Sequence, residues 1–206
     1  MSLQSYQHRI RPGSPGAPIL FGFHGTGGDE NQFFDFAARL MPQATIVSPR
    51  GDVSEGGALR FFRRRAEGLY DMEDLAVRSA ALASFIAAHR DEAQAGAVYG
   101  LGYSNGANIL AAMMFEDGTL FDGAVLMHPL IPWSPEPNSD LKGRDIVITA
   151  GRRDPICPPA QTEALAAYLV SQQAHVDLQW HDGGHDIRPN EIGAAQAFAS
   201  RVASAV

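Results

Sequence analysis

Gly102-Tyr103-Ser104-Asn105-Gly106 joins an apolar run at residues 97–103 to a helix-like segment at residues 105–116. The pentapeptide has the pattern Gly-x-Ser-x-Gly, which marks a sharp turn between a strand and a helix. Such a turn strains the backbone of the serine and exposes its hydroxyl group, and the glycines avoid clashes where strand and helix pass closely. This context predicts that Ser104 is a nucleophile. The alternative is a glycine-rich turn whose serine caps the helix.

Further apolar runs and helical patterns alternate along the chain on both sides of this turn. The runs are rich in Val, Ile and Leu and end near Gly or Pro, as buried strands do. They occupy residues 19–24, 44–49, 123–128, 145–151 and 175–181. The helical patterns occupy residues 30–41, 71–89, 159–173 and 189–202, and residues 53–69 and 129–142 are expected to be loops. The alternation predicts one α/β domain over residues 1–206, with a mostly parallel sheet and helices on both faces.

The composition is that of a soluble globular protein, with 45% hydrophobic and 19% charged residues. A formal net charge of -7 disfavours nucleic acid as a partner, because an acidic protein repels phosphate backbones. The single cysteine, Cys157, cannot form an internal disulfide. No signal-peptide pattern is visible at the start, and no apolar stretch is long enough to span a bilayer. We therefore expect a cytoplasmic protein without stable membrane insertion.

A nucleophilic serine needs a histidine base and an acidic group that orients the histidine. Where a serine occupies a turn of this kind, the acid and then the histidine follow it along the chain. His185 lies in a Gly-Gly-His loop after the last predicted strand, and Asp154 lies in the loop that follows Gly151. We predict Ser104, Asp154 and His185 as a catalytic triad. Asp182 and Asp186 are rivals for the acid, but both are sequence neighbours of His185.

An acyl-transfer site also needs two backbone N–H groups that stabilise the oxyanion. One belongs to the residue after the nucleophile, Asn105, and the other is expected from the glycine-rich loop at residues 24–28, where Thr26 is the candidate. A glycine-rich loop can also bind phosphate, but this one lacks the lysine of a Walker motif and the glycine spacing of a dinucleotide site.

Taken together, these segments resemble the phospholipase/carboxylesterase family of small serine hydrolases, which includes acyl-protein thioesterases and has the α/β-hydrolase fold. The resemblance covers about residues 19–198. It is carried by segments 23–30, 102–108, 126–129, 151–158 and 183–185, and residues 60–64 look like those of a bacterial subgroup of carboxylesterases. Acyl-protein thioesterases usually carry glutamine in place of Asn105 and leucine or methionine in place of Thr26.

The resemblance implies a serine carboxylesterase that needs no cofactor and no metal, and it allows a homodimer. We expect an acyl-enzyme on Ser104 and a small-molecule ester as substrate. A chain of this length leaves little room for a lid domain, so short or medium acyl chains or aromatic esters are favoured. Thioester or lysophospholipid hydrolysis is the nearest alternative, and a non-catalytic ligand sensor with this fold is the alternative from another class.

The candidate residues of the substrate pocket are His24, Phe62, Arg63, His128, Trp133 and Ile156. Two interpretations stand for the basic run Arg63–Arg65, which either forms a pocket wall or is a solvated loop paired with Glu55 or Glu67. Trp133 either walls the acyl site or packs within its loop. His128 either lines the site or is an ordinary half-buried histidine. Cys157 is not in the serine turn and is expected to be a partly buried bystander.

Overall fold

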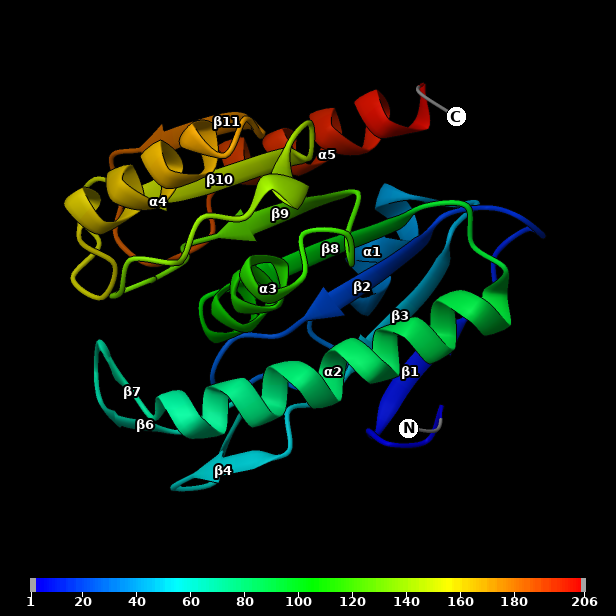
Figure 1. Cartoon of the computed structure of the whole chain (residues 1–206), viewed down its shortest axis with the longest axis horizontal. Coiled ribbons are helices and arrows are strands. Elements are labelled where there is room, and N and C mark those ends of the chain that lie inside the picture. The colour runs from blue at the N-terminus through cyan, green and yellow to red at the C-terminus, as the bar shows by residue number, and fades with distance from the viewer. Residues whose placement is uncertain (1–2, 205–206) are drawn as a thin grey trace.

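The computed structural model describes residues 3–204, and its centre is a seven-stranded sheet (Figure 1). The strand order is β1-β3-β2-β8-β9-β10-β11. Only β1 is antiparallel to its neighbour, and the remaining pairs are parallel. The strands are β1 (His8–Arg11), β2 (Ile19–Phe23), β3 (Thr45–Pro49), β8 (Val98–Tyr103), β9 (Gly123–Met127), β10 (Asp145–Gly151) and β11 (His175–His181).

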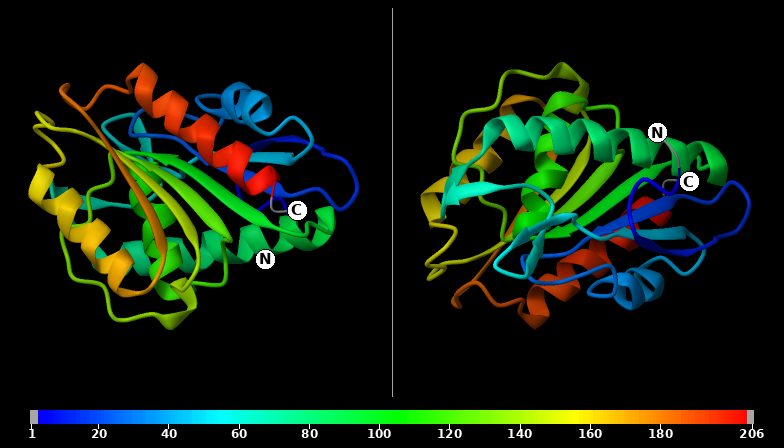
Figure 2. Two further views of the ribbon diagram at one scale, coloured as in Figure 1. Left: turned by 90° about the horizontal axis from the view of Figure 1, so that it is seen from above. Right: turned by 90° about the horizontal axis from the view of Figure 1, so that it is seen from below.

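Among residues 3–204, five helices cover the two faces of this sheet (Figure 2). They are α1 (Phe34–Leu40), α2 (Met72–Ala93), α3 (Asn105–Glu116), α4 (Pro159–Ser171) and α5 (Pro189–Ala203). Helices α1 and α5 lie on one face, and α2, α3 and α4 lie on the other. Each face has its own apolar core, because the central strands are buried on both sides. The predicted α/β-hydrolase fold, without a large lid, is confirmed.

The six predicted strands correspond to β2, β3, β8, β9, β10 and β11, but the sequence analysis missed β1. The sequence of β1 shows no clear alternation of apolar and polar residues, and its one apolar residue, Ile10, is exposed. The predicted helix at residues 30–41 begins only at Phe34, since residues 30–33 form a turn, and there the Glu30 side chain pairs with Arg50 (Nη2 to Oε1, 2.7 Å).

The predicted loop at residues 53–69 instead contains two short antiparallel hairpins. They are formed by β4 (Val53–Glu55) with β5 (Ala58–Arg60), and by β6 (Arg64–Ala66) with β7 (Leu69–Tyr70). Gly56 and Gly57 form the first turn with φ of 58° and 92°. Two successive residues with positive φ are what a tight hairpin turn requires, and glycine adopts them without strain. The 129–142 connection stays irregular apart from a short 3-10 turn, η1 (Ser139–Leu141).

The carboxyl ends of the parallel strands point to the left in Figure 1, the side on which the β6–β7 hairpin lies. The loops that follow β2, β8, β10 and β11 therefore meet at this edge of the sheet, where ligands bind in folds of this class.

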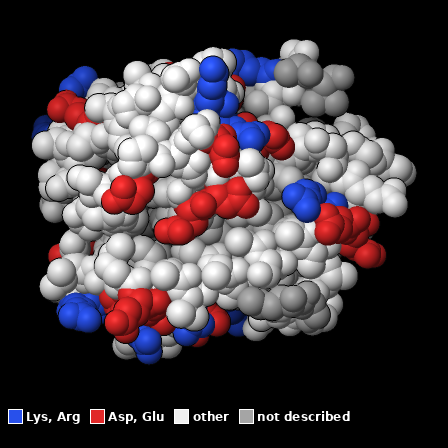
Figure 3. Space-filling model, viewed as in Figure 1, with Lys and Arg blue, Asp and Glu red and all other residues white. Residues whose placement is uncertain are grey.

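On the face shown in Figure 3, basic side chains of the described residues lie in separate groups, several of them beside acidic ones. Among residues 3–204, no helix is long and apolar enough to cross a membrane.

Candidate active site

Ser104 lies at the sharp turn between β8 and α3, with φ 51° and ψ -117°. Its backbone N–H donates to the carbonyl of Met127 at 2.9 Å, which ties the turn to the neighbouring strand. Gly106 lies against β2, and a Cβ atom there would be 2.3 Å from the Phe23 carbonyl oxygen. A Cβ atom on Gly102 would be 2.8 Å from the Cα of Ala107. The glycines are therefore required by close backbone approach, as the motif predicts.

The loops after β8, β10 and β11 bring Ser104, Asp154 and His185 together. His185 Nε2 lies 2.9 Å from Ser104 Oγ, and His185 Nδ1 lies 2.7 Å from Asp154 Oδ2. The Asp154 side chain is fully buried, whereas 17% of the His185 side chain is exposed. The rival carboxylates, Asp182 and Asp186, are both exposed. The contacts have the order nucleophile, base and orienting acid that acyl transfer uses.

The Asp154 carboxylate is held from several sides. Its Oδ1 accepts hydrogen bonds from the N–H groups of Ile156 (2.8 Å) and Cys157 (3.0 Å). Its Oδ2 faces a second ring nitrogen, His128 Nδ1, at 2.8 Å. Burial alone would raise the pKa of Asp154, but these hydrogen bonds outweigh burial and hold the pKa below its ordinary value. Asp154 is therefore an anion whose orientation is set by its backbone neighbours.

The two residues predicted to supply oxyanion N–H groups, Thr26 and Asn105, both line the pocket that contains Ser104. Asn105 is the first residue of α3, so its N–H has no partner within the helix, and Thr26 lies across the pocket. Within residues 3–204, neither N–H donates to another residue. The Thr26 loop is held in place by Gly27, whose N–H donates to Leu59 O at 2.9 Å. The predicted pair of oxyanion donors therefore lines the same pocket as Ser104.

The pocket at Ser104 has a volume of about 250 Å³. This is below the roughly 300–1,000 Å³ of typical small-molecule sites, so the pocket suits a small group. Its lining residues are Thr26, Arg60, Arg64, Glu67, Tyr70, Tyr103, Ser104, Asn105, Asn108, Leu130, Ile156, Cys157 and His185.

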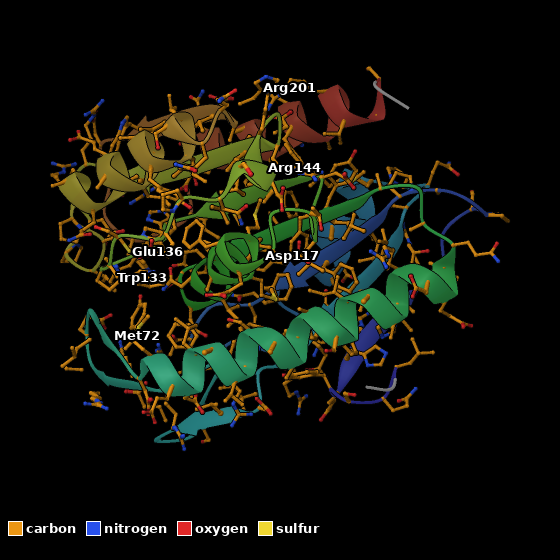
Figure 4. The ribbon with its side chains drawn as sticks, in the orientation of Figure 1. Met72, Asp117, Trp133, Glu136, Arg144 and Arg201 are labelled. Carbon is orange, nitrogen blue, oxygen red and sulfur yellow. The ribbon has the colours of Figure 1, made fainter. Side chains whose placement is uncertain are left out.

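Of the six candidate pocket residues, Ile156 lines this pocket and the other five lie elsewhere. Phe62 is fully buried in the core, and His24 is buried with its Nε2 accepting from Gly51 N–H at 2.8 Å. His128 is buried behind Asp154. In Figure 4, Trp133 lies beside Glu136 and across from Met72, where the three line a separate hollow between α2 and the 129–142 connection.

Arg60 and Arg64 supply the basic groups of the pocket, whereas the candidate was Arg63. The Arg63 side chain is 61% exposed and pairs with Asp74 at 3.1 Å (Nη2 to Oδ1). Residues 63 and 64 differ because successive side chains of an extended segment point to opposite sides. Arg64 lines the pocket and also pairs with Glu55 and Glu67, whereas Arg63 is exposed. The pocket interpretation therefore applies to Arg64, and the solvated interpretation applies to Arg63.

The sequence analysis missed Arg60 and a hydrogen-bonded group on the opposite wall. The Arg60 side chain is almost fully buried and its Nη1 donates to Thr26 Oγ1 at 2.7 Å. Opposite, Asn108 Nδ2 donates to the Tyr70 hydroxyl at 2.8 Å, and that hydroxyl donates to Leu130 O at 2.8 Å. Burial raises the pKa of the Tyr70 hydroxyl, so Tyr70 is neutral. These contacts make the pocket walls rigid.

Cys157 lines the pocket but is buried, and its Sγ donates to His128 O at 3.2 Å. Burial raises the pKa of the thiol, so the reactive thiolate does not form at neutral pH. We expect Cys157→Ala to retain kcat/KM within about three-fold of the wild type, because this change removes one weak hydrogen bond and little volume. Steady-state ester hydrolysis would measure this. A loss comparable to that of Ser104→Ala would assign the nucleophile to the thiol instead.

A second buried cluster lies behind Asp154 and consists of His128, Glu191 and His181. His128 Nε2 is 3.1 Å from Glu191 Oε1, and His181 Nε2 is 3.3 Å from Glu191 Oε2. The same three residues offer nitrogen and oxygen atoms within 4.8 Å of one another, which a divalent metal also requires. However, His181 Nδ1 accepts from Gly183 N–H at 2.9 Å, so the ring proton lies on Nε2. That protonation favours hydrogen bonding to Glu191 over metal ligation.

Comparison with known proteins agrees with this geometry. Residues 63–199, more than half of the chain, match the dienelactone hydrolase family. Over 182 residues the chain is 38% identical to the putative hydrolase MhqD of Bacillus subtilis (strain 168). The aligned region covers 87% of this chain and 91% of that protein.

Two solved structures are similar over nearly their whole length. Protein Atu2452 of Agrobacterium tumefaciens, described as of unknown function, has a TM-score of 0.93 and 55% identity over 98% of each chain. The carboxylesterase of Bacillus cereus has a TM-score of 0.89 and 36% identity over 95% of this chain and 94% of that one. The fold, the family match and these similarities identify an enzyme of the hydrolase class. The chain belongs to the dienelactone hydrolase family, within the α/β-hydrolase superfamily.

Proposed function

We propose that this hydrolase cleaves small or medium carboxylic esters through an acyl-enzyme on Ser104. The observation that carries the proposal is the pair of contacts made by His185, 2.9 Å to Ser104 Oγ and 2.7 Å to Asp154 Oδ2. The similarity to a carboxylesterase of Bacillus cereus supports an ester as the bond that is cleaved. The resemblance of several segments to the phospholipase/carboxylesterase family supports the same choice.

The reaction follows from the positions of these groups. Ser104 Oγ attacks the ester carbonyl while His185 Nε2 takes its proton, and Asp154 holds the imidazole and stabilises the imidazolium. The N–H groups of Thr26 and Asn105 stabilise the oxyanion, helped by the positive end of α3. His185 then protonates the leaving alcohol, and the acyl group stays on Ser104. Water activated by His185 attacks the acyl carbonyl and releases the acid by the same route.

The size and polarity of the pocket favour small substrates. Its volume of about 250 Å³ is too small for a long acyl chain in full contact. Arg60 and Arg64 both pair with Glu55, and Arg64 also pairs with Glu67, so two carboxylates balance the two guanidinium groups of the pocket wall. This supports an uncharged or weakly polar ester over the lysophospholipid and acyl-protein alternatives.

The test is hydrolysis of p-nitrophenyl esters with acyl chains from acetate to palmitate, with Ser104→Ala in parallel. We expect kcat/KM to be highest for short acyl chains and Ser104→Ala to lower it by at least about 10⁴-fold. A maximum at long chains would instead favour lipid or acyl-protein substrates. A folded wild type that neither hydrolyses an ester nor is labelled by a fluorophosphonate would contradict catalysis and favour a ligand sensor.

A further inference from the structure

His128 is held in an unusual position directly behind the proposed triad. It follows β9, its side chain is fully buried, and its φ is 50°, in the left-handed region that costs a non-glycine residue about 1 kcal/mol or more. The only other non-glycine residues with positive φ in the range 3–204 are Gln94, Ser104 and Gln173. The His128 N–H donates to Thr149 O at 2.8 Å, which fixes this conformation. The backbone therefore aims a histidine ring at the rear of Asp154.

Glu191 lies on the far side of that ring and is fully buried. Its Oε1 accepts from Thr149 Oγ1 at 2.5 Å, and its Oε2 accepts from the N–H of Arg188 at 2.6 Å. Burial by itself would raise the pKa of Glu191, but the hydrogen bonds from His128, Thr149 and Arg188 hold it below its ordinary value. Every contact of this carboxylate is with a hydrogen-bond donor, so Glu191 is a buried anion that needs a cation beside it.

The His128 ring supplies that cation because both of its nitrogens face carboxylate oxygens. Nδ1 lies 2.8 Å from Asp154 Oδ2, and Nε2 lies 3.1 Å from Glu191 Oε1. A neutral ring can donate only one of these hydrogen bonds, whereas an imidazolium donates both. Burial opposes a charge on the ring, but the two carboxylates outweigh burial and raise the pKa of His128 above its ordinary value.

The remaining groups around His128 are aromatic rings, and the nearest is His181, whose Nε2 lies 3.5 Å from His128 Nε2. His181, at the end of β11, is a neutral Nε2–H tautomer because its Nδ1 accepts from Gly183 N–H. Tyr103, at the end of β8, packs edge-on against the His128 ring at 5.8 Å, and burial raises the pKa of its hydroxyl to about 12. His185 lies 4.9 Å away, ring centre to ring centre. The charged groups that contact His128 directly are therefore the two carboxylates.

We propose that Glu191 and His128 are positioning residues that act on the triad through Asp154, with Glu191 keeping His128 positively charged. This inference rests on the proposed function of Ser104, Asp154 and His185. The His128 cation shares Asp154 Oδ2 with His185, so it fixes the rotation of the carboxylate. It also offsets part of the negative charge that Asp154 presents to His185.

The variant Glu191→Gln tests the coupling, because it keeps the shape of the side chain and removes the charge. Without the second anion, His128 loses its proton and Asp154 acts on His185 with its full charge. We expect the acid limb of the kcat/KM profile to move to higher pH by roughly one unit, with KM within about two-fold. The matched control is Thr149→Val, which removes one hydrogen bond to Glu191 but no charge. It should lower stability and leave the acid limb in place.

A second measurement needs no turnover. Nitrogen-15 NMR of the histidine rings in the wild type should show both His128 nitrogens protonated at pH 8, and Glu191→Gln should show one. A singly protonated His128 ring in the wild type would overturn the inference. So would an acid limb that stays in place in a folded Glu191→Gln, or that moves equally in Thr149→Val.

The two proposals can fail separately. A wild type without esterase activity would count against the proposed function, while the NMR result would still decide the charge of His128. If the enzyme is active but the acid limb does not move in Glu191→Gln, the proposed esterase activity would stand. Glu191 and His128 would then have no part in its mechanism.

Discussion

Asp154→Asn is expected to lower kcat by about 10⁴-fold, the size of effect that the same change has where an aspartate orients the histidine of a triad. In this protein Oδ1 accepts from the N–H groups of Ile156 and Cys157, so the amide oxygen of an asparagine takes that side. Its NH2 group then faces His185 and donates to Nδ1. The ring proton of His185 moves to Nε2, which can no longer accept the proton of Ser104.

The same substitution should also lower the free energy of unfolding, because the new NH2 group faces His128 Nδ1, and the ring then gives up that proton and its charge-assisted hydrogen bond to Asp154. A hydrogen bond to a charged group contributes about 1.5–3 kcal/mol to stability. Hydrolysis of p-nitrophenyl acetate and urea denaturation measure the two effects. Asp182→Asn is the control, since that side chain is exposed. A variant Asp154→Asn that keeps a tenth of the wild-type kcat would rule out Asp154 as the orienting acid.

Of the two glycine-to-alanine substitutions in the serine turn, Gly106→Ala should be the more destabilising. The new Cβ atom would lie 2.3 Å from Phe23 O and 2.5 Å from His24 O, and neither backbone atom can move without shifting β2. We expect a loss of about 3 kcal/mol or more in unfolding free energy. For a chain of this size, that corresponds to a fall in Tm of roughly 6–12 °C. The displaced turn would also misplace the Asn105 N–H and reduce activity.

Gly193→Ala provides the matched control for this prediction. Gly193 is an exposed residue within α5, and a Cβ atom there would contact nothing within 4 Å. Alanine is a better helix former than glycine by about 1 kcal/mol, so this variant should be slightly more stable than the wild type. Thermal unfolding followed by circular dichroism compares the two. If both variants behaved alike, the close approach at Gly106 would not limit which residues the turn accepts.

Local patterns predicted much of the architecture. Five of the six parallel strands, all except the edge strand β11, were visible because each is a short apolar run that ends at a turn, and burial on both faces imposes that composition. The serine turn was visible because two backbones pass too closely for any residue but glycine at Gly102 and Gly106. Asp154 and His185 could be predicted because they lie in loops after parallel strands, and such loops meet at one edge of the sheet.

Other features left weaker signals or none. Gly56-Gly57 is typical of a hairpin turn, but the strands on either side of it have only three residues each, which is too short to show a strand pattern. Glu191 occupies the third position of α5, where glutamate commonly caps a helix, so its sequence context indicates only a cap. Nothing local shows that its carboxylate also faces His128. Arg60 stands in a short strand, and its place in the pocket depends on the distant Thr26.

The sequence by itself determined the alternation of the six parallel strands with helices, the serine turn and the three loops that carry Ser104, Asp154 and His185. These are properties of neighbouring residues, set by backbone sterics and by the periodicity of burial. Only the tertiary structure decided which side chains line the pocket and that a buried Glu191–His128 pair lies behind Asp154. Those contacts join residues far apart in the chain, and their partners depend on how the loops pack, which no local pattern records.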